Sequence, residues 1–439
     1  MTDMPELIVD LIEASKKHEQ YRDKECINMI ASEGIKSPAV CQMLDMSHDL
    51  ATRYAEGDND ALGHVKKRYY QGQKYMSQIE DLACDAVKNL FGAFWADIRL
   101  ISGTHANTAT FKGLSLASKN NKMVVTPLSC GAHISHDYTG LAGSILGIDD
   151  LKEFNIDAEK SAYVIRAAKP GIVTFGGSLF LFPHPIKELK EVCDEVGAYV
   201  AYDAAHVLGL IAGGQFQDPL REGADFITSS THKTFPGPQG GVIMGNPDTP
   251  AKEKAVRKIQ HAVFPLTASS THLGRLPALG VACLEMKIFG KELTAQIVKN
   301  AQTAGQYLYE NGIKVIAEHK GFTRSHQIAL DIRTFGGGNK IAQDLEDANI
   351  ILNKNLLPYD DQDTKENPSG LRVGFQDITR RGFREGDVKH LCDLMLDVIK
   401  GKRSPAEVKV DVLELKKEFS GVKYGFQSVD EALKYVKKD

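Results

Sequence analysis

The chain has 439 residues, of which 42% are hydrophobic and 25% are charged, the balance of an ordinary soluble protein. A formal net charge of -4 and the lack of a dense Lys/Arg block argue against a dedicated nucleic-acid surface, so a small or anionic ligand has to be held by local groups. A chain of this length exceeds one small core and predicts two domains with terminal extensions.

The N-terminal segment and the cysteine pattern point to a cytoplasmic protein. Residues 1–20 have neither a basic start nor a long apolar run, so we expect no signal peptide. The sequence contains no apolar stretch of about 20 residues that could span a membrane. The 7 cysteines are scattered without a CxxC pair, which is typical of reduced thiols, and we expect no metal site.

In chain order, the first predicted element is an amphipathic helix near the N-terminus. Its apolar stripe consists of Leu7, Ile8, Leu11 and Ile12. The stripe can pack on its own domain or clasp a partner chain, and both interpretations stay open. We predict that residues 1–35 form an N-terminal arm.

The next region, residues 36–290, is predicted to be a large domain built on a sheet. Short apolar runs alternate there with helical stretches. Buried strands are expected at residues 123–126, 172–175, 199–202 and 226–228. A helix over residues 185–196 lies between two of them, with Pro185 in its first turn and Gly197 at its end. Strand, helix and strand at this spacing indicate parallel strands with covering helices.

A second, smaller α/β domain is predicted over residues 291–439. A long amphipathic helix begins near Gly290 and is closed by Asn311 and Gly312. Strands are expected at residues 327–332 and 350–352, and a loop at residues 336–338. Near the end, residues 428–431 have the form of a capping box before a last short helix.

The strongest local chemical signal is Lys233, within Ser-Ser-Thr-His-Lys-Thr-Phe-Pro-Gly-Pro-Gln-Gly-Gly at residues 229–241. A lone lysine is most often simply solvent-facing. This one comes just after a buried strand, where open α/β sheets bind ligands. A partly desolvated lysine at such a place has a lowered pKa and can form a Schiff base.

Asp203 ends the preceding predicted strand, 30 residues before Lys233 and about one βαβ unit away. The two side chains are therefore expected to emerge from neighbouring strands at one sheet edge. Pyridoxal phosphate needs such a pair, a lysine for its aldehyde and a carboxylate for its pyridinium nitrogen. Capping of a helix is the structural alternative for Asp203.

Four further segments contain residue types that this chemistry uses. The small polar residues at 102–107 can open a helix whose backbone donors bind a phosphate. His133 offers a flat imidazole for ring stacking. Glu56 is a carboxylate that can shuttle protons. Arg372 can grip an α-carboxylate through two parallel hydrogen bonds. Taken singly, each of these side chains is more often structural or solvated.

Together, these segments resemble the serine hydroxymethyltransferases, from about Ile30 to about Gly401. The order and spacing of the motifs agree along the chain. Residues 176–183 and 209–218 look like the archaeal branch. The matching motifs are Ala-Ser-Glu 31–33, Tyr-Ala-Glu-Gly 54–57, Arg-Tyr-Tyr 68–70, Ser-Gly 102–103, His133, Asp-Ala-Ala-His 203–206, Thr-His-Lys-Thr 231–234, Asn-Lys-Asn 353–355, Arg-Val-Gly 372–374 and Ile-Thr-Arg-Arg-Gly-Phe 378–383.

The resemblance implies a fold-type I pyridoxal-phosphate transferase, with a mostly parallel central sheet covered by helices on both faces and a smaller C-terminal α/β domain. It implies reversible transfer of the serine hydroxymethyl carbon to a reduced pterin, either tetrahydrofolate or a tetrahydromethanopterin-like carrier. The products would be glycine and the methylene-pterin. It also implies a homodimer, because the family's active sites lie at a dimer interface.

The resemblance also implies cofactor contacts by position. Lys233 would bind the aldehyde, Asp203 would pair with the pyridinium nitrogen, and His133 would stack on the ring. The other contacts would be Ser178 and His206 at the ring substituents and Ser102, Gly103, Thr104 and His232 around the phosphate.

The substrate contacts that the resemblance implies come from four other segments. Ser32 and Arg372 would hold the substrate carboxylate. Glu56 would be the proton shuttle at the hydroxymethyl group, and Asn353 would be a candidate pterin contact. Tyr54 and Tyr70 would line the site from the partner subunit.

Three departures separate the chain from the common bacterial pattern. Gln239 stands where those enzymes usually have Arg. Residues 264–270 replace a Gly-rich segment that reaches the partner's phosphate, and the connector at residues 58–67 is longer than usual. We expect these changes to alter pterin recognition more than the cofactor site.

Two alternatives remain at this point. A threonine-type aldolase or transaldolase on the same scaffold would need the same Lys233, Asp203 and Arg372, although the retained Glu56 and Asn353 favour pterin-dependent transfer. A non-catalytic relative would be marked by loss of Lys233 or Arg372, and both are present.

Overall fold

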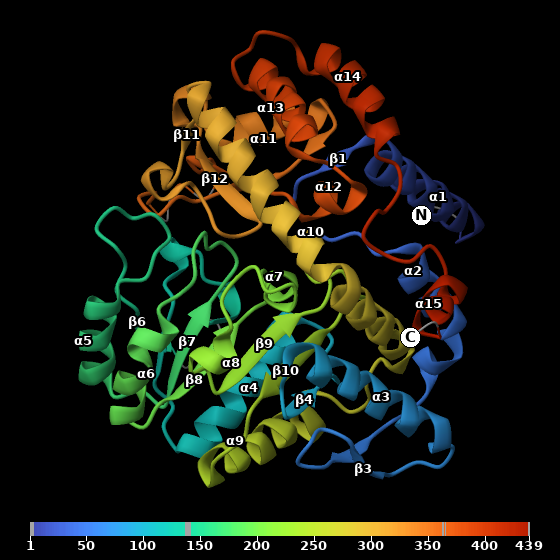
Figure 1. The fold of residues 1–439 in the computed structure, drawn as a ribbon, viewed down its shortest axis with the longest axis vertical. Helices are drawn as coiled ribbons and strands as arrows, with labels where there is room; N and C mark the ends of the chain where they lie inside the picture. Colours follow the sequence, from blue (N-terminus) through green and yellow to red (C-terminus); the bar gives the residue numbers. More distant parts are fainter. Residues whose placement is uncertain (1–3, 137–141, 362–363, 365, 438–439) are drawn as a thin grey trace.

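The computed structural model describes residues 4–136, 142–361, 364 and 366–437, and it contains two main sheets with helices around them (Figure 1). The larger sheet has 7 strands, and the smaller one has 4. No helix of the described residues is long and apolar enough to cross a membrane.

The helices alternate with strands through the first part of the chain and dominate the end of it. Their bounds are α1 Met4–Glu19, α2 Pro38–Met46, α3 Lys74–Phe91, α4 Gly103–Ser118, α5 Ala158–Ala168, α6 Ile186–Glu195, α7 Leu208–Ala212, α8 Pro219–Glu222, α9 Pro250–His261, α10 Leu276–Glu310, α11 Gly338–Asp347, α12 Gln376–Arg381, α13 Glu385–Ile399, α14 Pro405–Glu418 and α15 Val429–Val436.

The central sheet is mostly parallel, as predicted. From β9 to β6 every neighbouring pair is parallel, whereas β10 runs antiparallel to both of its neighbours. The four predicted buried strands are confirmed as β5, β7, β8 and β9. In spatial order the strands are β4 Trp95–Asp97, β10 Gly241–Gly245, β9 Phe226–Ser230, β8 Tyr199–Asp203, β7 Ile172–Gly176, β5 Met123–Val125 and β6 Ala142–Ile145.

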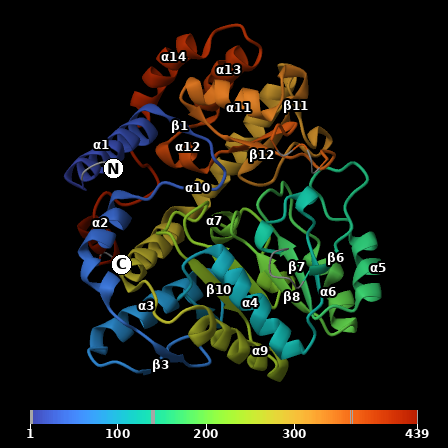
Figure 2. The same cartoon turned by 180° about the vertical axis from the view of Figure 1, so that it is seen from behind.

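Alternate side chains of these strands pack on opposite faces of the sheet. Val200 and Tyr202 belong to the apolar cluster that includes residues of α3, α6 and α10. Ala201, between them, belongs to the cluster formed with α4 and α9 (Figure 2). Because both faces are covered, the strands are apolar without alternation, as parallel sheets usually are.

The predicted helix between β7 and β8 is confirmed as α6. Its buried residues Ile186, Leu189, Val192 and Cys193 form the expected face. Gly197 follows with φ +71°, a left-handed conformation that ends the helix at low cost.

The smaller sheet is antiparallel and lies in the C-terminal half. Its strands are β11 Lys314–Val315, β12 Gln327–Asp331, β15 Gly370–Gly374 and β14 Asn353–Asn355. The predicted strand at residues 327–332 is confirmed as β12. The one at residues 350–352 corresponds to β13, Ile350–Ile351, which pairs with β1, Ile27–Asn28, in a separate two-stranded sheet. A last antiparallel pair, β2 Gly57–Asn59 and β3 Val65–Arg68, forms a hairpin.

The helix α10 is longer than the sequence predicted. It begins at Leu276 rather than near Gly290, with Pro277 in its first turn, and it ends before Asn311 as predicted. Its 35 residues run past the central sheet and along the smaller one (Figure 1). Residue 290, the predicted domain boundary, lies inside it. The division into an arm, residues 36–290 and residues 291–439 stays a prediction.

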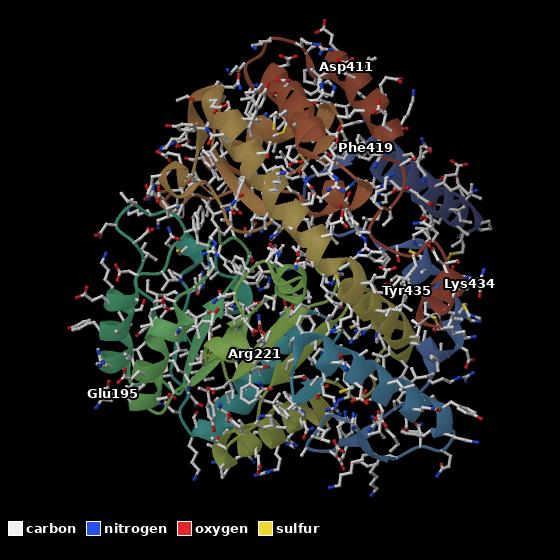
Figure 3. The ribbon with its side chains drawn as sticks, viewed as in Figure 1. Glu195, Arg221, Asp411, Phe419, Lys434 and Tyr435 are labelled. Atoms are coloured by element: carbon white, nitrogen blue, oxygen red, sulfur yellow. The ribbon has the colours of Figure 1, made fainter. Side chains whose placement is uncertain are left out.

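The first and last helices, α1 and α15, lie on the same side of the molecule (Figure 1). The helix α1 has no buried residue. At the other end Ser428 caps α15 by accepting a hydrogen bond from the Glu431 backbone N–H at 3.1 Å, which is half of the predicted capping box. Tyr435 of α15 packs against Phe426 with ring centroids 5.7 Å apart (Figure 3). The C-terminal residues therefore return to the helices beside the larger sheet.

Candidate active site

The predicted pair Asp203 and Lys233 lies at one edge of the central sheet. Asp203 is the last residue of β8, and Lys233 follows the neighbouring parallel strand β9. In the register of these strands Asp203 pairs with Thr228. The carboxyl ends of parallel strands are where open α/β sheets form their ligand sites, so the position of the pair is the expected one.

Burial changes the protonation of the Lys233 amine. It lowers the pKa of Lys233 to about 8; the Arg372 charge acts in the same direction and the Asp203 charge opposes it. A larger fraction of neutral amine is then present near neutral pH, and neutral amine is the form that attacks an aldehyde.

The backbone around Lys233 is held from several sides. The Thr234 hydroxyl donates to the His206 carbonyl at 2.8 Å and accepts from the Gly209 N–H at 3.1 Å. A Cβ on Gly34 would lie 2.1 Å from the Lys233 carbonyl oxygen. Only a glycine allows this approach, which brings the segment containing Ser32 against the lysine.

Asp203 is a buried carboxylate with three hydrogen-bond donors. Its Oδ2 accepts from Asn107 Nδ2 at 2.8 Å and interacts with His136 Nε2 at 2.9 Å, while Oδ1 accepts from the Ala205 N–H at 3.0 Å. Burial raises the pKa of Asp203, but the hydrogen bond and charge of His136 outweigh it and hold the pKa well below its usual range. The side chain stays an anion that can pair with a protonated ring nitrogen.

Asn107 and His136 were missed as site residues in the sequence. Asn107 also accepts a hydrogen bond from Thr228 Oγ1, and its amide nitrogen donates to Ser135 Oγ at 2.9 Å. The only available signal was their presence in the two segments that contain Ser102 and His133. Nothing in the local spacing links either residue to Asp203.

The predicted histidines lie around this pair and are neutral. His133 is hydrogen-bonded through Nδ1 to Ser135 Oγ at 2.8 Å. His206 stacks on His326, with centroids 5.8 Å apart and planes 27° apart. Burial lowers the pKa of His133, lowers that of His206 far below its usual value, and lowers that of His232 to about 4. Within the described residues, the buried Nδ1 atoms of His206 and His232 have no hydrogen-bond partner.

The helix α4 points its N-terminus at the same sheet edge. Ser102 is its N-cap and accepts from the His105 N–H at 3.1 Å. A Cβ on Gly103 would lie 3.3 Å from the Ser230 backbone nitrogen, so the first turn rests directly on the end of β9. Thr104 is exposed there. The first N–H groups of a helix have no intrahelical partner, and they make a site for an anion such as a phosphate.

Arg372 is a buried cation on β15. Its Nε donates to Asn353 Oδ1 at 3.1 Å and its Nη1 to the Ser178 carbonyl at 2.9 Å. Burial lowers the pKa of Arg372 to about 10, so it remains charged at neutral pH. No carboxylate of the described residues forms an ion pair with it. A buried charge without a counter-ion is costly, and an anionic ligand would compensate it.

The segment with Ser32 is fastened to the same strand. The Gly374 N–H donates to the Met29 carbonyl at 2.8 Å, and Gln376 Nε2 donates to the Ile30 carbonyl at 2.7 Å. His326 Nε2 is hydrogen-bonded to the Ala31 carbonyl at 3.1 Å. Ser32 is thereby placed between β15 and the Lys233 loop, although its hydroxyl makes no hydrogen bond within the described part of the chain.

Three predicted residues do not join this group within one chain. Tyr54 and Tyr70 pack together with ring centroids 5.4 Å apart, and both are about half exposed. Glu56 is two residues after Tyr54, and its carbonyl accepts a hydrogen bond from the Tyr69 N–H at 3.0 Å. No hydrogen bond, ion pair or ring contact of the described residues connects these side chains to Lys233 or Asp203.

Two other predicted residues contact the site differently from the expectation. Ser178 contacts Arg372 through its carbonyl. Asn353 accepts a hydrogen bond from Arg372 with its side-chain oxygen, and its amide nitrogen donates to the Lys354 carbonyl at 2.8 Å. Their predicted roles toward the ring and the pterin stay predictions.

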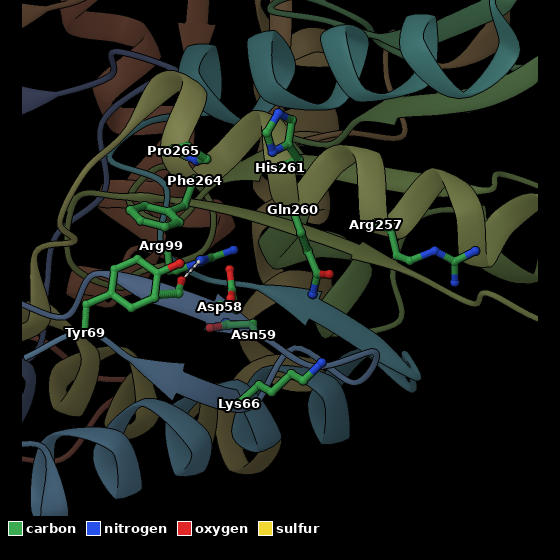
Figure 4. Close-up of a pocket in the computed structure, with 11 residues that line it drawn as sticks. Asp58, Asn59, Lys66, Tyr69, Arg99, Arg257, Gln260, His261, Phe264 and Pro265 are labelled. Atoms are coloured by element: carbon green, nitrogen blue, oxygen red, sulfur yellow. Dashed lines mark hydrogen bonds between the residues drawn. The ribbon is translucent and has the colours of Figure 1, made fainter.

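Two of the three sequence departures, the connector at residues 58–67 and the segment at residues 264–270, line a pocket of about 500 Å³ (Figure 4). Asp58 and Lys66 of the long connector line it, together with Phe264 and Pro265 of the replaced segment. Phe264 also packs on Tyr69, with centroids 5.9 Å apart. The connector and the replaced segment are therefore spatial neighbours, although about 200 residues separate them in the sequence.

Comparison with known proteins gives one consistent result. A family model described as serine hydroxymethyltransferase matches residues 5–395. The serine hydroxymethyltransferase of Sulfolobus acidocaldarius is 45% identical over 444 residues, covering 100% of this chain and 99% of the relative. That of Staphylothermus marinus is 46% identical and covers 99% and 96%.

A solved structure gives the same fold. The L-threonine transaldolase from Pseudomonas fluorescens superposes with a TM-score of 0.82 and 26% identity, covering 98% of this chain and 97% of that one. The fold-type I architecture predicted from the sequence is thereby confirmed. With a family model that spans most of its length and relatives that match it end to end, the chain belongs to the serine hydroxymethyltransferase family.

Proposed function

We propose that the chain is a pyridoxal-phosphate-dependent serine hydroxymethyltransferase, which moves the hydroxymethyl carbon of serine reversibly to a reduced pterin. The observation that carries the proposal is the buried Arg372 guanidinium, which lacks a carboxylate partner in the described chain and lies beside the Asp203–Lys233 pair. A site that binds an amino acid needs that combination, because the cation binds the carboxylate and the lysine holds the cofactor with which the amine reacts. The name shared by the relatives supports the proposal.

The residues present fit pyridoxal phosphate. Asp203 is a permanent anion for the ring nitrogen, and Lys233 has the lowered pKa of a nucleophilic amine. The N-terminus of α4, with Ser102, Gly103 and Thr104, can bind the phosphate of the cofactor. When bound, the cofactor supplies an electron sink that stabilises negative charge at the amino acid's α-carbon.

The chain's own residues bind and orient the reactants around that group. Lys233 holds the cofactor's aldehyde, and Asp203 keeps a proton on the ring nitrogen. The neutral imidazole of His133 can lie over the ring, and those of His206 and His232 can hydrogen-bond ring substituents and phosphate through Nδ1 atoms that have no other partner in the described chain.

Arg372 and Ser32 orient the substrate through its carboxylate. The Nε and Nη1 contacts of Arg372 fix the plane of the guanidinium, which leaves Nη2 without a partner among the described residues. A carboxylate can then be bound as a fork rather than as a point charge. This placement fixes which substituent of the amino acid faces the proton shuttle.

Glu56 moves the proton at the hydroxymethyl oxygen or at the pterin, with Tyr54 and Tyr70 around it. Within one chain Tyr54 and Tyr70 pack together, and no hydrogen bond, ion pair or ring contact of the described residues links them or Glu56 to Lys233. We therefore place them in the active site of a partner subunit, which makes the functional unit a homodimer. Asn353, which accepts a hydrogen bond from Arg372 Nε, is the residue that we propose as a pterin contact.

The test is conversion of serine to glycine by the purified protein, with tetrahydrofolate, with tetrahydromethanopterin and with no pterin. We expect turnover to depend strongly on one of the two carriers. Serine turnover that is equal with and without each pterin would contradict the proposal.

A transaldolase is the second candidate, because the L-threonine transaldolase structure matches almost the whole chain. It would use the same Lys233, Asp203 and Arg372. Its signature would be rapid cleavage of threonine in the absence of any pterin, with transfer to an added aldehyde. Comparing threonine and serine as substrates under the same conditions separates the two functions.

A further inference from the structure

A second buried arginine lies next to the phosphate side of the site. Arg275 directly precedes α10, and only 6% of its surface is exposed. Its Nη2 donates to the carbonyls of Ile98, Leu100 and Gly241; the last two are at 2.9 and 3.3 Å. Its Nε and Nη1 have no hydrogen-bond partner among the described residues.

The positive charge of Arg275 is not neutralised by its protein surroundings. The carboxylate that acts on it is Asp97, and Asp97 already binds Arg99 through Nε at 3.0 Å and Nη2 at 2.6 Å. No ion pair of the described residues includes Arg275. Burial lowers the pKa of Arg275 to about 10, which leaves it charged at neutral pH.

The three carbonyls belong to the two backbone segments that form the phosphate side of the site. Ile98 and Leu100 lead into Ser102, the N-cap of α4. Gly241 closes the loop that holds His232 and Lys233, and its N–H donates to the Leu100 carbonyl at 2.8 Å. Arg275 therefore fastens the start of α4 to the end of the lysine loop.

Two further observations place the charge of Arg275 at this position. A Cβ on Gly240 would come within 2.4 Å of Arg275 Nη1, so the guanidinium packs against the backbone next to Gln239. The charge of Arg275 also contributes to lowering the pKa of His232. A cation is thus present behind the turn where the side chain of Gln239 is uncharged and exposed.

We propose that Arg275 is a positioning residue for the phosphate of the cofactor. It fixes the N-terminus of α4 against the Lys233 loop, and its uncompensated charge favours a dianion in front of that terminus. This proposal rests on the proposed function, since it assumes that the site takes pyridoxal phosphate. Because Nε and Nη1 are enclosed by protein, Arg275 acts through the backbone of both segments and through its charge.

The test compares two ligands that differ only in the phosphate. The dissociation constants of pyridoxal phosphate and of pyridoxal would be measured for the apoprotein and for Arg275→Met and Arg275→Lys, by the visible absorbance of the bound ligand. Arg221→Met is the control, because Arg221 is an exposed arginine on α8 whose ion pair is with Asp218 (Figure 3).

We expect Arg275→Met to weaken the binding of pyridoxal phosphate by roughly 10- to 100-fold, the scale of one charge-assisted interaction. The binding of pyridoxal should weaken by less than about 3-fold. Arg275→Lys keeps the charge and should fall between Met and the unaltered protein. Equally weakened binding of both ligands would show a merely structural role and overturn the proposal. A ratio of the two dissociation constants that stays unchanged in either variant would overturn it as well.

A second measurement tests the proposal without the Met variant, in case Arg275→Met folds poorly. Inorganic phosphate should raise the melting temperature of the apoprotein, and the rise should be smaller in Arg275→Lys. An equal rise in both proteins would overturn the proposal. Failure of the unaltered protein to bind pyridoxal phosphate at all would instead refute the proposed function, so the two failures are distinguishable.

Discussion

Replacing Arg372 by lysine should weaken serine binding while leaving cofactor binding nearly intact. The substitution keeps a positive charge on β15 but removes the fork of Nη1 and Nη2. It also removes the Nε contact with Asn353 at 3.1 Å and the Nη1 contact with the Ser178 carbonyl at 2.9 Å, which set the plane of the guanidinium. A lysine ammonium cannot reproduce either geometry.

The size of the effect follows from the contacts. A hydrogen bond to a charged group contributes roughly 1.5–3 kcal/mol, so loss of one such bond to the substrate carboxylate should lower serine affinity about 10- to 150-fold. Arg372→Met, which also loses the charge, should lie at or beyond the upper end. The cofactor contacts come from other residues, so the affinity of the protein for the cofactor should change little.

The assay is titration of the cofactor-loaded protein with serine, followed by the visible absorbance of the bound cofactor and without pterin. Arg333→Met serves as a matched control, since Arg333 is a half-exposed arginine whose ion pair is with Asp331. If a folded, cofactor-loaded Arg372→Lys binds serine as tightly as the unaltered protein, the carboxylate is held elsewhere and our interpretation of Arg372 is wrong.

Three further predictions concern the amine and the proton shuttle. Lys233→Ala should lose turnover, measured as serine-to-glycine conversion, although it can still bind the cofactor; unchanged turnover would refute the assignment. Since burial lowers the pKa of Lys233 to about 8, the rate of cofactor capture by the apoprotein should rise about 10-fold per pH unit up to pH 8 and level off above it. A rise that continues to pH 10 would mean an ordinary lysine. Glu56→Gln should keep the absorbance change on adding serine but reduce pterin-dependent transfer by about 100-fold or more, the scale of acid–base catalysis. Equal transfer rates in both proteins would make Glu56 structural.

Local patterns in the sequence were sufficient to predict the parallel strands β5, β7, β8 and β9 of the central sheet and the edge at which Asp203 and Lys233 lie. Buried parallel strands are short apolar runs, and the intervening helix was marked by Pro185 and Gly197. Since adjacent βαβ strands end at the same edge, the spacing of Asp203 and Lys233 also predicted their proximity. These predictions depend on periodicity and chain order, which a sequence shows directly.

Contacts between distant segments could not be predicted in this way. The pairing of β13 with β1 joins residues far apart in the chain, and no period signals it. The same holds for Asn107 and His136, which reach Asp203 from α4 and from a short 3-10 helix at Ile134–His136. Arg275 had no distinguishing signal in the sequence, because its burial depends on contacts with Ile98, Leu100 and Gly241.

The start of α10 was mispredicted for a different reason. Residues before Gly290 are apolar on more than one side, since this half of the helix packs against α2, α3 and α7, and the amphipathic pattern is clear only beyond it. A helix buried on several sides does not show the single stripe of a surface helix.

The uninterrupted course of α10 determines how the molecule can come apart. At about 1.5 Å per residue the helix is roughly 52 Å long. Met286 and Leu293 belong to the apolar core of the larger sheet, whereas Ala301 and Leu308 belong to that of the smaller one. If either core unfolded alone, it would expose to water the apolar face of α10 that packs against it, while the other core still held the rest of the helix. Heating should therefore unfold both cores in one cooperative transition. Cutting the chain near residue 290 should therefore yield two insoluble fragments, and not two independent domains.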